Sequence, residues 1–543
     1  MSVTLIYPIG HEGEKRANRG RKLVPTLITS IITSDQQAVY HVEVGRQKSI
    51  SNLMGWAALL AVMALGAIAA GQAPNKTVHA SGVDAKIDRI MNGLLPGAII
   101  KGRPTPKMTL ADRMNYYKVP EMSIAVLDHG QIAWAQGYGL ADKEANNPVT
   151  PETLFQAASV SKSVTALAAL CLVQQGKLNL DEDVNLKLVS WKVPDNEFTK
   201  NEKVTLRRLL SHTAGMTVPS VGGYLAGEYM PTTVQILSGE RTSNEPVRVD
   251  RVPGKEFRYS GGGYVVVQLL LMDVTGKSFP ALMRDLVFEP LSMTRSTFEA
   301  PLPKGLWSGV AQPYDRARND WFSYSAMAPA GLWTTPSDLL RFTIEIEKAY
   351  AGESKLLSSA LAHEMLAYQS AEIYGLGVAL GQRGHAVTFW HSGANGGYQC
   401  LFVGYPETGQ GLAIMTDGAG GLRLIGEIQR AVAQEYNWPD GRMEEHTLAK
   451  IDPSALRAFT GVYLFGGLFK FIITQDEGKL YVQYGPFGDN PQELFAESDT
   501  RFFMLSQPVV IDFQKESDGS IKKARVRNGA EELDGERISE APR

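Results

Sequence analysis

The stretch that decides the fold is "FQAASVSKSVTALAA", residues 155–169, in which a turn of small residues precedes an apolar, helix-forming run. Within it, Ser159 and Lys162 are three positions apart. If a helix starts at Ser159, Lys162 lies about one turn further along the same face, within reach of the serine hydroxyl. Main-chain N–H groups at that helix start would also face the serine and offer positive potential to an oxyanion. The stretch therefore predicts a nucleophilic serine beside an amine.

A serine hydroxyl is a weak nucleophile unless a neighbouring base takes its proton. Lysine can be that base if burial depresses its pKa and keeps part of it neutral, and the apolar run 164–172 supplies the burial. The same spacing recurs at Ser520 and Lys523, in a charged and β-rich stretch. Because the second copy lacks the helical context, spacing alone is weak evidence for a catalytic pair.

A tyrosine is the third catalytic candidate. In "GKEFRYSGGGYVVVQLLL", Tyr259 lies on a Gly-rich turn immediately before an apolar helix, so its phenol can point into a cleft while the helix anchors the loop. A phenolate beside Lys162 would also be a credible base, and the sequence leaves the division of acid and base roles between the two residues open. The alternative reading is a tyrosine packed on the surface of its helix.

The stretch "FWHSGANGGYQCLF" adds candidates for substrate binding. It places His391, Ser392, Gly393 and Ala394 at the end of a strand-like run, where glycine permits close approach of a substrate to the strand edge. The N–H of Ala394 is expected to join the Ser159 N–H as the second oxyanion donor. Taken alone, a histidine such as His391 is more often a hydrogen-bonded core or edge residue than a substrate anchor. His212, in "LLSHTAGM", is interpreted as structural because its neighbours form a helix end and a turn.

Composition excludes several classes of protein. The 543 residues are 44% hydrophobic and 20% charged, as in ordinary globular proteins, and the net charge of −3 argues against nucleic-acid binding. The two cysteines, Cys171 and Cys400, lie in apolar stretches without C-x-x-C spacing, which favours buried thiols over a disulfide or a metal site. His363-Glu364 lacks the second histidine of a zinc motif, so no metal site is predicted.

An apolar segment near the N-terminus indicates export. "MGWAALLAVMALGAIAA", residues 54–70, resembles the apolar region of a signal peptide, and Ala67-Ile68-Ala69 fits an A-x-A cleavage site. The preceding 53 residues carry an excess of Lys and Arg, which also fits a membrane anchor of marginal length with a cytoplasmic tail. A buried core helix is the third reading. The first two predict a periplasmic or secreted catalytic region, or one anchored in the inner membrane and facing away from the cytoplasm.

The pattern beyond this segment predicts two folded domains. A hairpin around Asp128-His129-Gly130, a helical middle over 159–291, later strand-like runs and a helix over 422–436 predict an antiparallel sheet, closed by its first and last segments, beside an all-helical lobe. Alternating segments broken by Gly turns then predict a small β domain. We expect a tail over 1–53, a signal peptide or anchor over 54–71, a tether over 72–107, a catalytic domain over 108–445 and a C-terminal β-barrel-like domain over 452–543.

Several sequence blocks together carry a family resemblance. "FQAASVSK", "LLSHTAGM", "RYSGGGY", "PAGLWTTPSDLLRF" and "HSGANGG" resemble, in order and placement, blocks of the serine β-lactamase and penicillin-binding-protein superfamily. They are most similar to the class C branch, which includes family VIII carboxylesterases and D-amino-acid-specific peptidases. The resemblance covers about residues 108–436 and implies the α+β fold just described. The C-terminal part weakly resembles the lipocalin-like domain of some relatives.

The resemblance implies roles and also shows departures. Ser159 resembles the acylated nucleophile, Lys162 its proton partner and Tyr259 the tyrosine of the Y-x-N element. The third position of that element is Gly261 here, which lacks the side-chain amide of the family's asparagine and is a further candidate for substrate binding. His391, Ser392 and Gly393 match the K-T-G box, with His391 in place of the lysine that would hold a substrate carboxylate. No metal or organic cofactor is implied.

These matches and departures lead to three hypotheses on function. The favoured one is an exported serine hydrolase, of the carboxylesterase or D-amino-acid-specific peptidase type, that acts on a small-molecule or short-peptide acyl substrate. A β-lactamase or penicillin-binding DD-peptidase is the first alternative, and a non-catalytic ligand-binding protein with the same fold is the second.

Overall fold

The structure is a computed structural model that describes residues 81–541, except for 315–316, 370–373, 382–384, 419, 466–468, 485–490 and 529–530. The predicted tail over 1–53 and the predicted signal peptide or anchor over 54–71 lie outside the described residues. Within the described part, no single helix is long and apolar enough to span a membrane, although one pair of helical segments bent by 80°, Gly261–Thr275 with Phe279–Phe288, meets the length and composition criteria together.

An antiparallel sheet forms the centre of the catalytic domain. Among the described residues it has seven strands in the order β4-β3-β2-β10-β9-β8-β7. Strands β2 and β3 form the predicted hairpin, joined by His129 and Gly130, which both have positive φ, as in a type I′ turn. Strand β10 pairs antiparallel with β2, which confirms that the first and last segments of the domain meet. The strands are β2 (Glu121–Asp128), β3 (Gln131–Asp142), β4 (Asn147–Pro148), β7 (Ala379–Leu380), β8 (Phe389–Ala394), β9 (Tyr398–Tyr405) and β10 (Gln410–Asp417).

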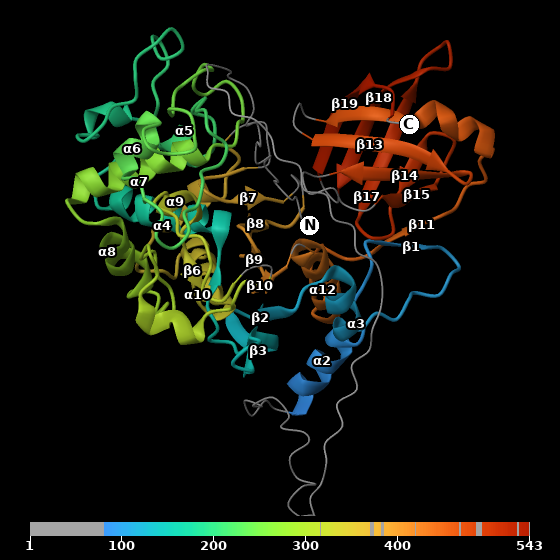
Figure 1. Cartoon of the computed structure of the whole chain (residues 1–543), viewed down its shortest axis with the longest axis horizontal. Helices are drawn as coiled ribbons and strands as arrows, with labels where there is room; N and C mark the ends of the chain where they lie inside the picture. The colour runs from blue at the N-terminus through green and yellow to red at the C-terminus, as the bar shows by residue number, and fades with distance from the viewer. Residues whose placement is uncertain are drawn as a thin grey trace, which may run out of the picture. The chain divides into compact units, whose positions relative to one another are not determined.

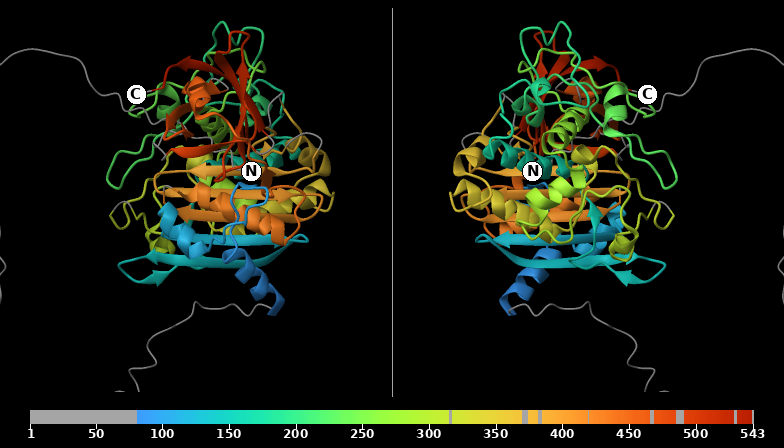
Figure 2. Two further views of the ribbon diagram at one scale, coloured as in Figure 1. Left: turned by 90° about the vertical axis from the view of Figure 1, so that its right-hand side faces the viewer. Right: turned by 90° about the vertical axis from the view of Figure 1, so that its left-hand side faces the viewer.

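Helices cover both faces of this sheet, as Figure 2 shows from two sides. Side chains alternate along β10: Ala413 and Met415 join the core that includes α10 (Pro336–Tyr350), whereas Leu412 and Ile414 join the core that includes α12 (Gly421–Glu435). Strand β10 is buried along its whole length, and its middle residues, 411–415, are all apolar or glycine. The helix predicted over 422–436 is therefore confirmed as α12.

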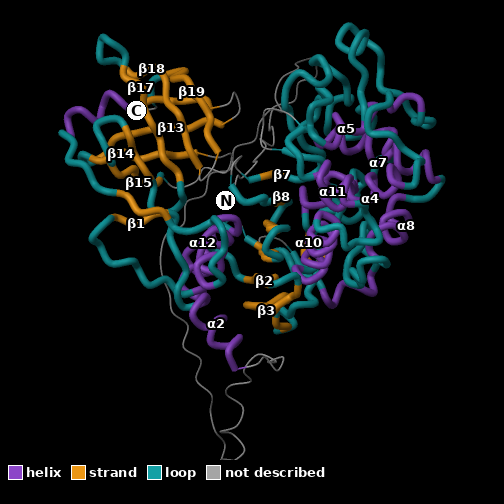
Figure 3. Tube along the Cα trace, turned by 180° about the vertical axis from the view of Figure 1, so that it is seen from behind, coloured by secondary structure: helices purple, strands orange, loops and turns teal. Residues whose placement is uncertain are grey.

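Between β3 and β7 the chain is mostly helical and looped (Figure 3). The apolar run predicted to be a buried helix is α4, which is buried along most of its length, and it packs with α7 and α9. Two short strands, β5 (Phe155–Gln156) and β6 (Trp333–Thr334), pair beside it. The helices of this lobe are α4 (Ser161–Gln174), α5 (Leu206–Leu210), α6 (Thr233–Ser238), α7 (Gly261–Thr275), α8 (Phe279–Met283), α9 (Met327–Ala330) and α11 (Ser359–Met365).

The expected tether is wrong for residues 81–107. Helix α2 (Ser81–Met91) packs on α12, with Ile87 and Ile90 buried, and Arg89 forms an ion pair with Glu435 at 2.6 Å. The amphipathic pattern of this stretch is the physical reason, because its apolar side needs a surface to cover it. Helix α3 (Leu110–Tyr117) also contacts α12, and β1 (Ala98–Ile100) pairs in parallel with β11 (Glu444–His446).

The C-terminal domain is a closed antiparallel barrel (Figure 1). Each strand pairs with the next in the chain, and β12 pairs with β19 to close the barrel. Alternating buried residues fill its interior, including Ile473, Val482 and Ile511. The strands are β12 (Gly461–Phe465), β13 (Phe469–Asp476), β14 (Lys479–Tyr484), β15 (Gln492–Ala496), β16 (Arg501–Phe503), β17 (Val509–Lys515), β18 (Ile521–Asn528) and β19 (Glu531–Ser539). The predicted fold class, an α+β domain followed by a small β domain, is confirmed.

Candidate active site

Ser159 lies on a sharp turn between strand and helix. It is the middle residue of a 3-10 turn, Ala158–Val160, that leads directly into α4, and it is partly exposed. The preceding Ala158 has a φ of 46°, a left-handed conformation that costs a non-glycine residue about 1 kcal/mol or more. The neighbouring main chain holds this turn, because Ala157 donates its N–H to the carbonyl of Leu332 at 2.8 Å. The sequence prediction of a serine at a helix start is confirmed.

Lys162 lies in the first turn of α4 and points at the serine. Its Nζ is 3.1 Å from the Ser159 Oγ and donates to the carbonyl of Pro329 at 2.8 Å. The side chain is only 2% exposed, and burial lowers the pKa of the amine to about 7. The predicted proximity and burial are therefore confirmed, and a large fraction of the amine is neutral near pH 7.

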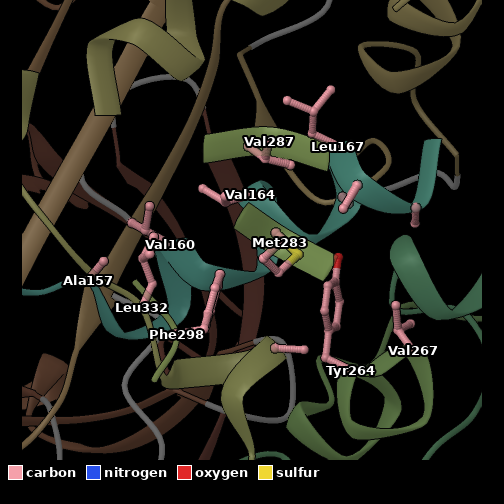
Figure 4. Packing of buried hydrophobic residues seen from close by; sticks show 14 of the residues in the cluster. Ala157, Val160, Val164, Leu167, Tyr264, Val267, Met283, Val287, Phe298 and Leu332 are labelled. Carbon is pink, nitrogen blue, oxygen red and sulfur yellow. The ribbon is translucent and has the colours of Figure 1, made fainter. Parts of the chain in front are cut away.

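Helix α4 is buried by apolar packing over most of its length. Figure 4 shows Val164 and Leu167 of the helix beside Met283 and Val287, with Tyr264 close by. All five side chains belong to one buried cluster. The Lys162 amine itself lies against the rings of Tyr259 and Tyr264, whose centres are 4.9 and 5.8 Å from its Nζ. Because this packing excludes water, a charge on the amine loses hydration, which is the physical cause of the lowered pKa.

Tyr259 completes the group around Ser159. It precedes α7, whose N-cap Ser260 accepts from the N–H of Gly263 at 2.9 Å, so the loop is fixed to the helix start as predicted. The Tyr259 side chain is buried, and the Lys162 Nζ lies 4.9 Å from the centre of its ring. Burial raises the pKa of the phenol above its ordinary value, and a hydrogen bond with the Ser159 side chain opposes that rise. The raised pKa keeps the phenol neutral, which disfavours the phenolate base.

Gly393 holds the serine turn against strand β8. A Cβ on Gly393 would lie 2.3 Å from the carbonyl oxygen of Ala157 and 3.1 Å from the Cβ of Ala158. The space that this glycine leaves is therefore used by the protein's own main chain, and its predicted role in substrate binding stays a prediction. Gly393 instead sets the spacing between the Ser159 turn and β8.

The N–H of Ala394 points away from the sheet. Asn395 donates its N–H to Tyr398 on β9, and in an antiparallel pair successive residues direct their main-chain groups to opposite sides. The main-chain N–H of Ala394 therefore faces away from β9, toward the β7 side of β8. The main chain of Thr388 faces the same side, because its carbonyl accepts from the N–H of Gly381. Strand β7 pairs only with the first two residues of β8, so it does not reach Ala394. This orientation is compatible with the predicted oxyanion role, which stays a prediction.

His391 is buried with both ring nitrogens bonded. It is 2% exposed; Nδ1 lies 2.6 Å from the carbonyl oxygen of Ser392, and Nε2 lies 3.0 Å from the hydroxyl of Tyr374. Burial and the nearby Lys162 lower the pKa of His391 to about 3. The predicted substrate-binding roles of His391 and Ser392 stay predictions, and the imidazole is more firmly neutral than its ordinary pKa implies.

Gly261 begins α7 and is buried. Its N–H donates to the carbonyl of Pro219 at 3.0 Å, and a Cβ there would lie 3.1 Å from the same oxygen. Any side chain at this position would press on the Pro219 loop. Gly261 can therefore offer a substrate only its main chain, and its predicted binding role stays a prediction.

Sequence reasoning missed three neighbours of the site. His212, interpreted as structural, is buried with its ring 4.1 Å from that of Tyr259, and its Nδ1 accepts from the N–H of Ser260. Tyr374 contacts His391, and the carbonyl of Pro329 contacts Lys162. The block "PAGLWTTPSDLLRF" contained a signal for Pro329, whereas Tyr374 lies in no recognisable motif.

The two cysteines, Cys171 and Cys400, are buried free thiols, as predicted. Among the described residues, no group of three or more His, Cys, Asp and Glu side chains is arranged to hold a metal ion.

Comparison with known proteins shows the family of the region that contains this site. The sequence profile of the family described as Beta-lactamase matches residues 107–435, which is more than half of the chain. The chain belongs to the Beta-lactamase family. The resemblance seen in the sequence is thereby confirmed, and with it membership of a family of hydrolases that share this fold.

Curated relatives and solved structures extend the comparison. Penicillin-binding protein 4* of Bacillus subtilis (strain 168) is 23% identical over 439 residues, covering 76% of this chain and 93% of that protein. Protein flp of Staphylococcus aureus (strain N315) is 27% identical over 247 residues, covering 42% of this chain, and the match spans less than half, 44%, of that relative.

The solved structures are similar in fold. The octameric penicillin-binding protein homologue from Pyrococcus abyssi has a TM-score of 0.52 at 24% identity, covering 78% of this chain and 98% of that one. D-amino acid amidase from Ochrobactrum anthropi SV3 has a TM-score of 0.50 at 21% identity, covering 65% and 99%.

Proposed function

We propose that this protein is an exported serine hydrolase that cleaves an ester or amide through an acyl-enzyme at Ser159. The observation that carries the proposal is the 3.1 Å distance between the Lys162 Nζ and the Ser159 Oγ in a buried setting. A buried amine with a pKa near 7 is matched to proton transfer at neutral pH. Family membership supports the same class of reaction.

Lys162 is the base in the first step that we propose. In its neutral form the amine can donate one N–H to the carbonyl of Pro329 and use its lone pair to accept the Ser159 hydroxyl proton across the 3.1 Å contact. As Ser159 attacks the acyl carbon, its proton moves to Lys162, and the resulting ammonium gains the face of the Tyr259 ring as a cation–π partner. In the proposal, Tyr259 passes its hydroxyl proton to the leaving group and takes up the proton of the Lys162 ammonium in turn, so both residues return to their neutral forms.

Main-chain N–H groups stabilise the oxyanion in this proposal. Ser159 supplies one N–H from the start of its 3-10 turn, where such groups lack helical partners. Ala394 supplies the second from the edge of β8, and Gly393 holds the two segments together. Removal of one such donor typically lowers kcat by about 10²-fold or more. Water then cleaves the acyl-enzyme.

The surroundings favour a substrate without a carboxylate near β8. His391 is neutral and internally bonded, so it cannot supply the charge that a lysine would at this position. Gly261 adds no side-chain amide. We therefore rank carboxylesterase or D-amino-acid-specific peptidase activity above β-lactamase or DD-peptidase activity. Export, to the periplasm or beyond, is proposed from the apolar segment 54–70.

Three substrates separate these activities. The protein is incubated with a short-chain aryl ester, a D-amino-acid anilide and a chromogenic cephalosporin, with Ser159→Ala as the control variant. Turnover of the ester or the anilide that disappears in the variant supports the proposal. Rapid turnover of the cephalosporin instead establishes the β-lactamase alternative. Binding without turnover, and no covalent labelling of Ser159, establishes the ligand-binding alternative.

A further inference from the structure

The tautomer of His391 follows from its two contacts. A carbonyl oxygen can only accept, so Nδ1, 2.6 Å from the carbonyl of Ser392, carries the ring proton of the neutral imidazole. Nε2 is then the bare nitrogen, and the hydroxyl of Tyr374, 3.0 Å away, donates to it. The imidazole therefore offers no unused N–H.

Tyr374 is held firmly in this position. Its side chain is 2% exposed, and its ring packs against those of His212 and Phe257, with centroids 5.0 and 5.6 Å apart. Its carbonyl accepts from the N–H of Gln369 at 3.1 Å. Turning the hydroxyl away from Nε2 would require this aromatic group to repack.

The groups around His391 oppose a positive charge on it. Lys162 of α4 lies close enough to repel that charge, and His212, from the segment after α5, interacts with it electrostatically. The ring of Tyr259 lies 6.3 Å from that of His391. None of these neighbours is a carboxylate, so a proton on Nε2 would need a partner brought by the substrate.

We propose that Tyr374 is a specificity-determining positioning residue: its hydroxyl occupies Nε2 while Nδ1 is bonded to the Ser392 carbonyl, so the neutral His391 ring has no nitrogen left for a substrate, and acyl substrates that carry a carboxylate beside β8 are excluded. The preferred substrates are then neutral esters and amides. This inference rests on the proposed serine hydrolase function, and it adds a residue outside every motif of the sequence.

Tyr374→Phe isolates the hydroxyl, because phenylalanine keeps the ring and its packing. In the variant, Nε2 has lost its donor, so it can take up a proton from solvent, and the resulting cation can bind a substrate carboxylate. Two matched aryl esters are compared, one with a free carboxylate on the acyl chain and one in which that carboxylate is a methyl ester. The measured quantity is the ratio of their kcat/KM values. Because hydrolysis of both esters depends on Lys162, the pH dependence of this base affects both kcat/KM values equally and cancels in their ratio.

We expect the wild type to prefer the methyl ester, and Tyr374→Phe to reduce that preference by about tenfold, the worth of one hydrogen bond to a charged group. The reduction should be larger near pH 6 than near pH 8, since the new contact needs a protonated imidazole. Tyr463→Phe, which removes a buried hydroxyl bonded to the carbonyl of Phe459 in the barrel, is the matched control and should leave the ratio unchanged.

An unchanged ratio in Tyr374→Phe, with methyl-ester turnover preserved, would overturn the inference while leaving the proposed function intact. Equal turnover of both esters by the wild type would also overturn it. If the wild type hydrolyses neither ester and Ser159 is not labelled by a fluorophosphonate, the proposed function fails and the specificity role falls with it.

A measurement on the wild type covers the case in which Tyr374→Phe does not fold. Nitrogen NMR of ¹⁵N-histidine protein, with His391→Gln to assign the signal, reports which ring nitrogen carries the proton. We expect the Nδ1–H form at both pH 6 and pH 8. An Nε2–H form, or a titration near the ordinary histidine pKa, would contradict the inference.

Discussion

The chain contains the same Ser-x-x-Lys spacing twice, in two regions with opposite outcomes. At Ser159, a 3-10 turn running into a helix brings the Lys162 amine to 3.1 Å from the hydroxyl. At Ser520, the chain enters strand β18, where residues rise about 3.3 Å each, and Lys523 is exposed. The Ser520 hydroxyl instead donates to Asp518 at 2.6 Å. Local structure, and not the spacing, therefore makes a reactive pair.

Two basic residues, one in the catalytic domain and one beside the barrel, also differ in their pKa because their burial and hydrogen-bond partners differ. Lys162 is bonded to a hydroxyl and a carbonyl, and burial lowers its pKa. His446, beside the barrel, lies between the carboxylates of Glu497 at 2.8 Å and Glu444 at 3.2 Å, and the hydrogen bond to Glu444 above all raises its pKa. The surroundings of Lys162 favour the neutral amine, which can accept a proton, whereas the two carboxylates beside His446 favour its positively charged form.

Serine removal gives the sharpest contrast between the two copies. Ser159→Ala should lower kcat/KM for a short-chain aryl ester by at least about 10³-fold, because the nucleophile is lost. Ser520→Ala should leave it within about twofold, since a surface substitution away from the site changes little. Steady-state kinetics on both variants check this. Equal losses would break the distinction between the two regions.

Lysine removal extends the contrast to the base. Lys162→Met should lower kcat/KM by about 10²- to 10⁴-fold, the usual range for general base catalysis. Lys523→Met is the matched control and should leave kcat/KM nearly unchanged.

The pH profile reports the same amine. Since the neutral form accepts the proton, activity is present above the Lys162 pKa of about 7 and is lost about tenfold per unit below it. Measurement of kcat/KM between about pH 5 and 9 tests this. A flat profile, or one that falls as the pH rises through 7, would count against Lys162 as the base.

Glycine substitution tests the contact that only the catalytic copy has. Gly393→Ala places a Cβ 2.3 Å from the carbonyl oxygen of Ala157, so the Ser159 turn must shift relative to β8. A misplacement of about 1 Å can lower activity about 10²-fold. Gly305→Ala, which has no heavy atom within 4 Å of the added Cβ, is the control. Kinetics and thermal unfolding of both variants show whether activity is lost beyond any loss of stability.

The smallest expected effect concerns the charge at the barrel. Because the pKa of His446 is raised, its contribution to stability is fully present below the unfolded value of about 6.5 and is lost as the pH rises through the folded value. His446→Gln should therefore remove on the order of 1 kcal/mol of pH-dependent stability. Urea unfolding near pH 6 and pH 9 measures it. An identical pH dependence in the variant would show that other groups are responsible.

Much of the catalytic constellation could be predicted from sequence because it is local. Ser159 and Lys162 share one helix turn, Tyr259 marks the start of α7, and the hairpin at Gly130 has its own turn signal. The alternation of buried and exposed residues along the barrel strands could be predicted in the same way. In these cases periodicity and turn chemistry determine the structure without reference to distant residues.

Contacts between distant segments could not be predicted. Tyr374 and the Pro329 carbonyl of α9 reach the site from segments more than a hundred residues beyond Ser159, and no spacing rule connects them to it. The same limit applies to Gly393, whose strand location suggested contact with a substrate although it packs on Ala157. The docking of α2 on α12 also depends on a surface that only the folded domain creates.

The central claim, that a buried neutral amine makes Ser159 reactive, is tested most directly by the rate of fluorophosphonate labelling as a function of pH, with the modified peptide located by mass spectrometry. The account predicts an adduct on Ser159, formed at a rate that rises through pH 7, and no adduct on Ser520. Absence of the adduct on Ser159, or labelling at the same rate from about pH 5 to 9, would contradict it.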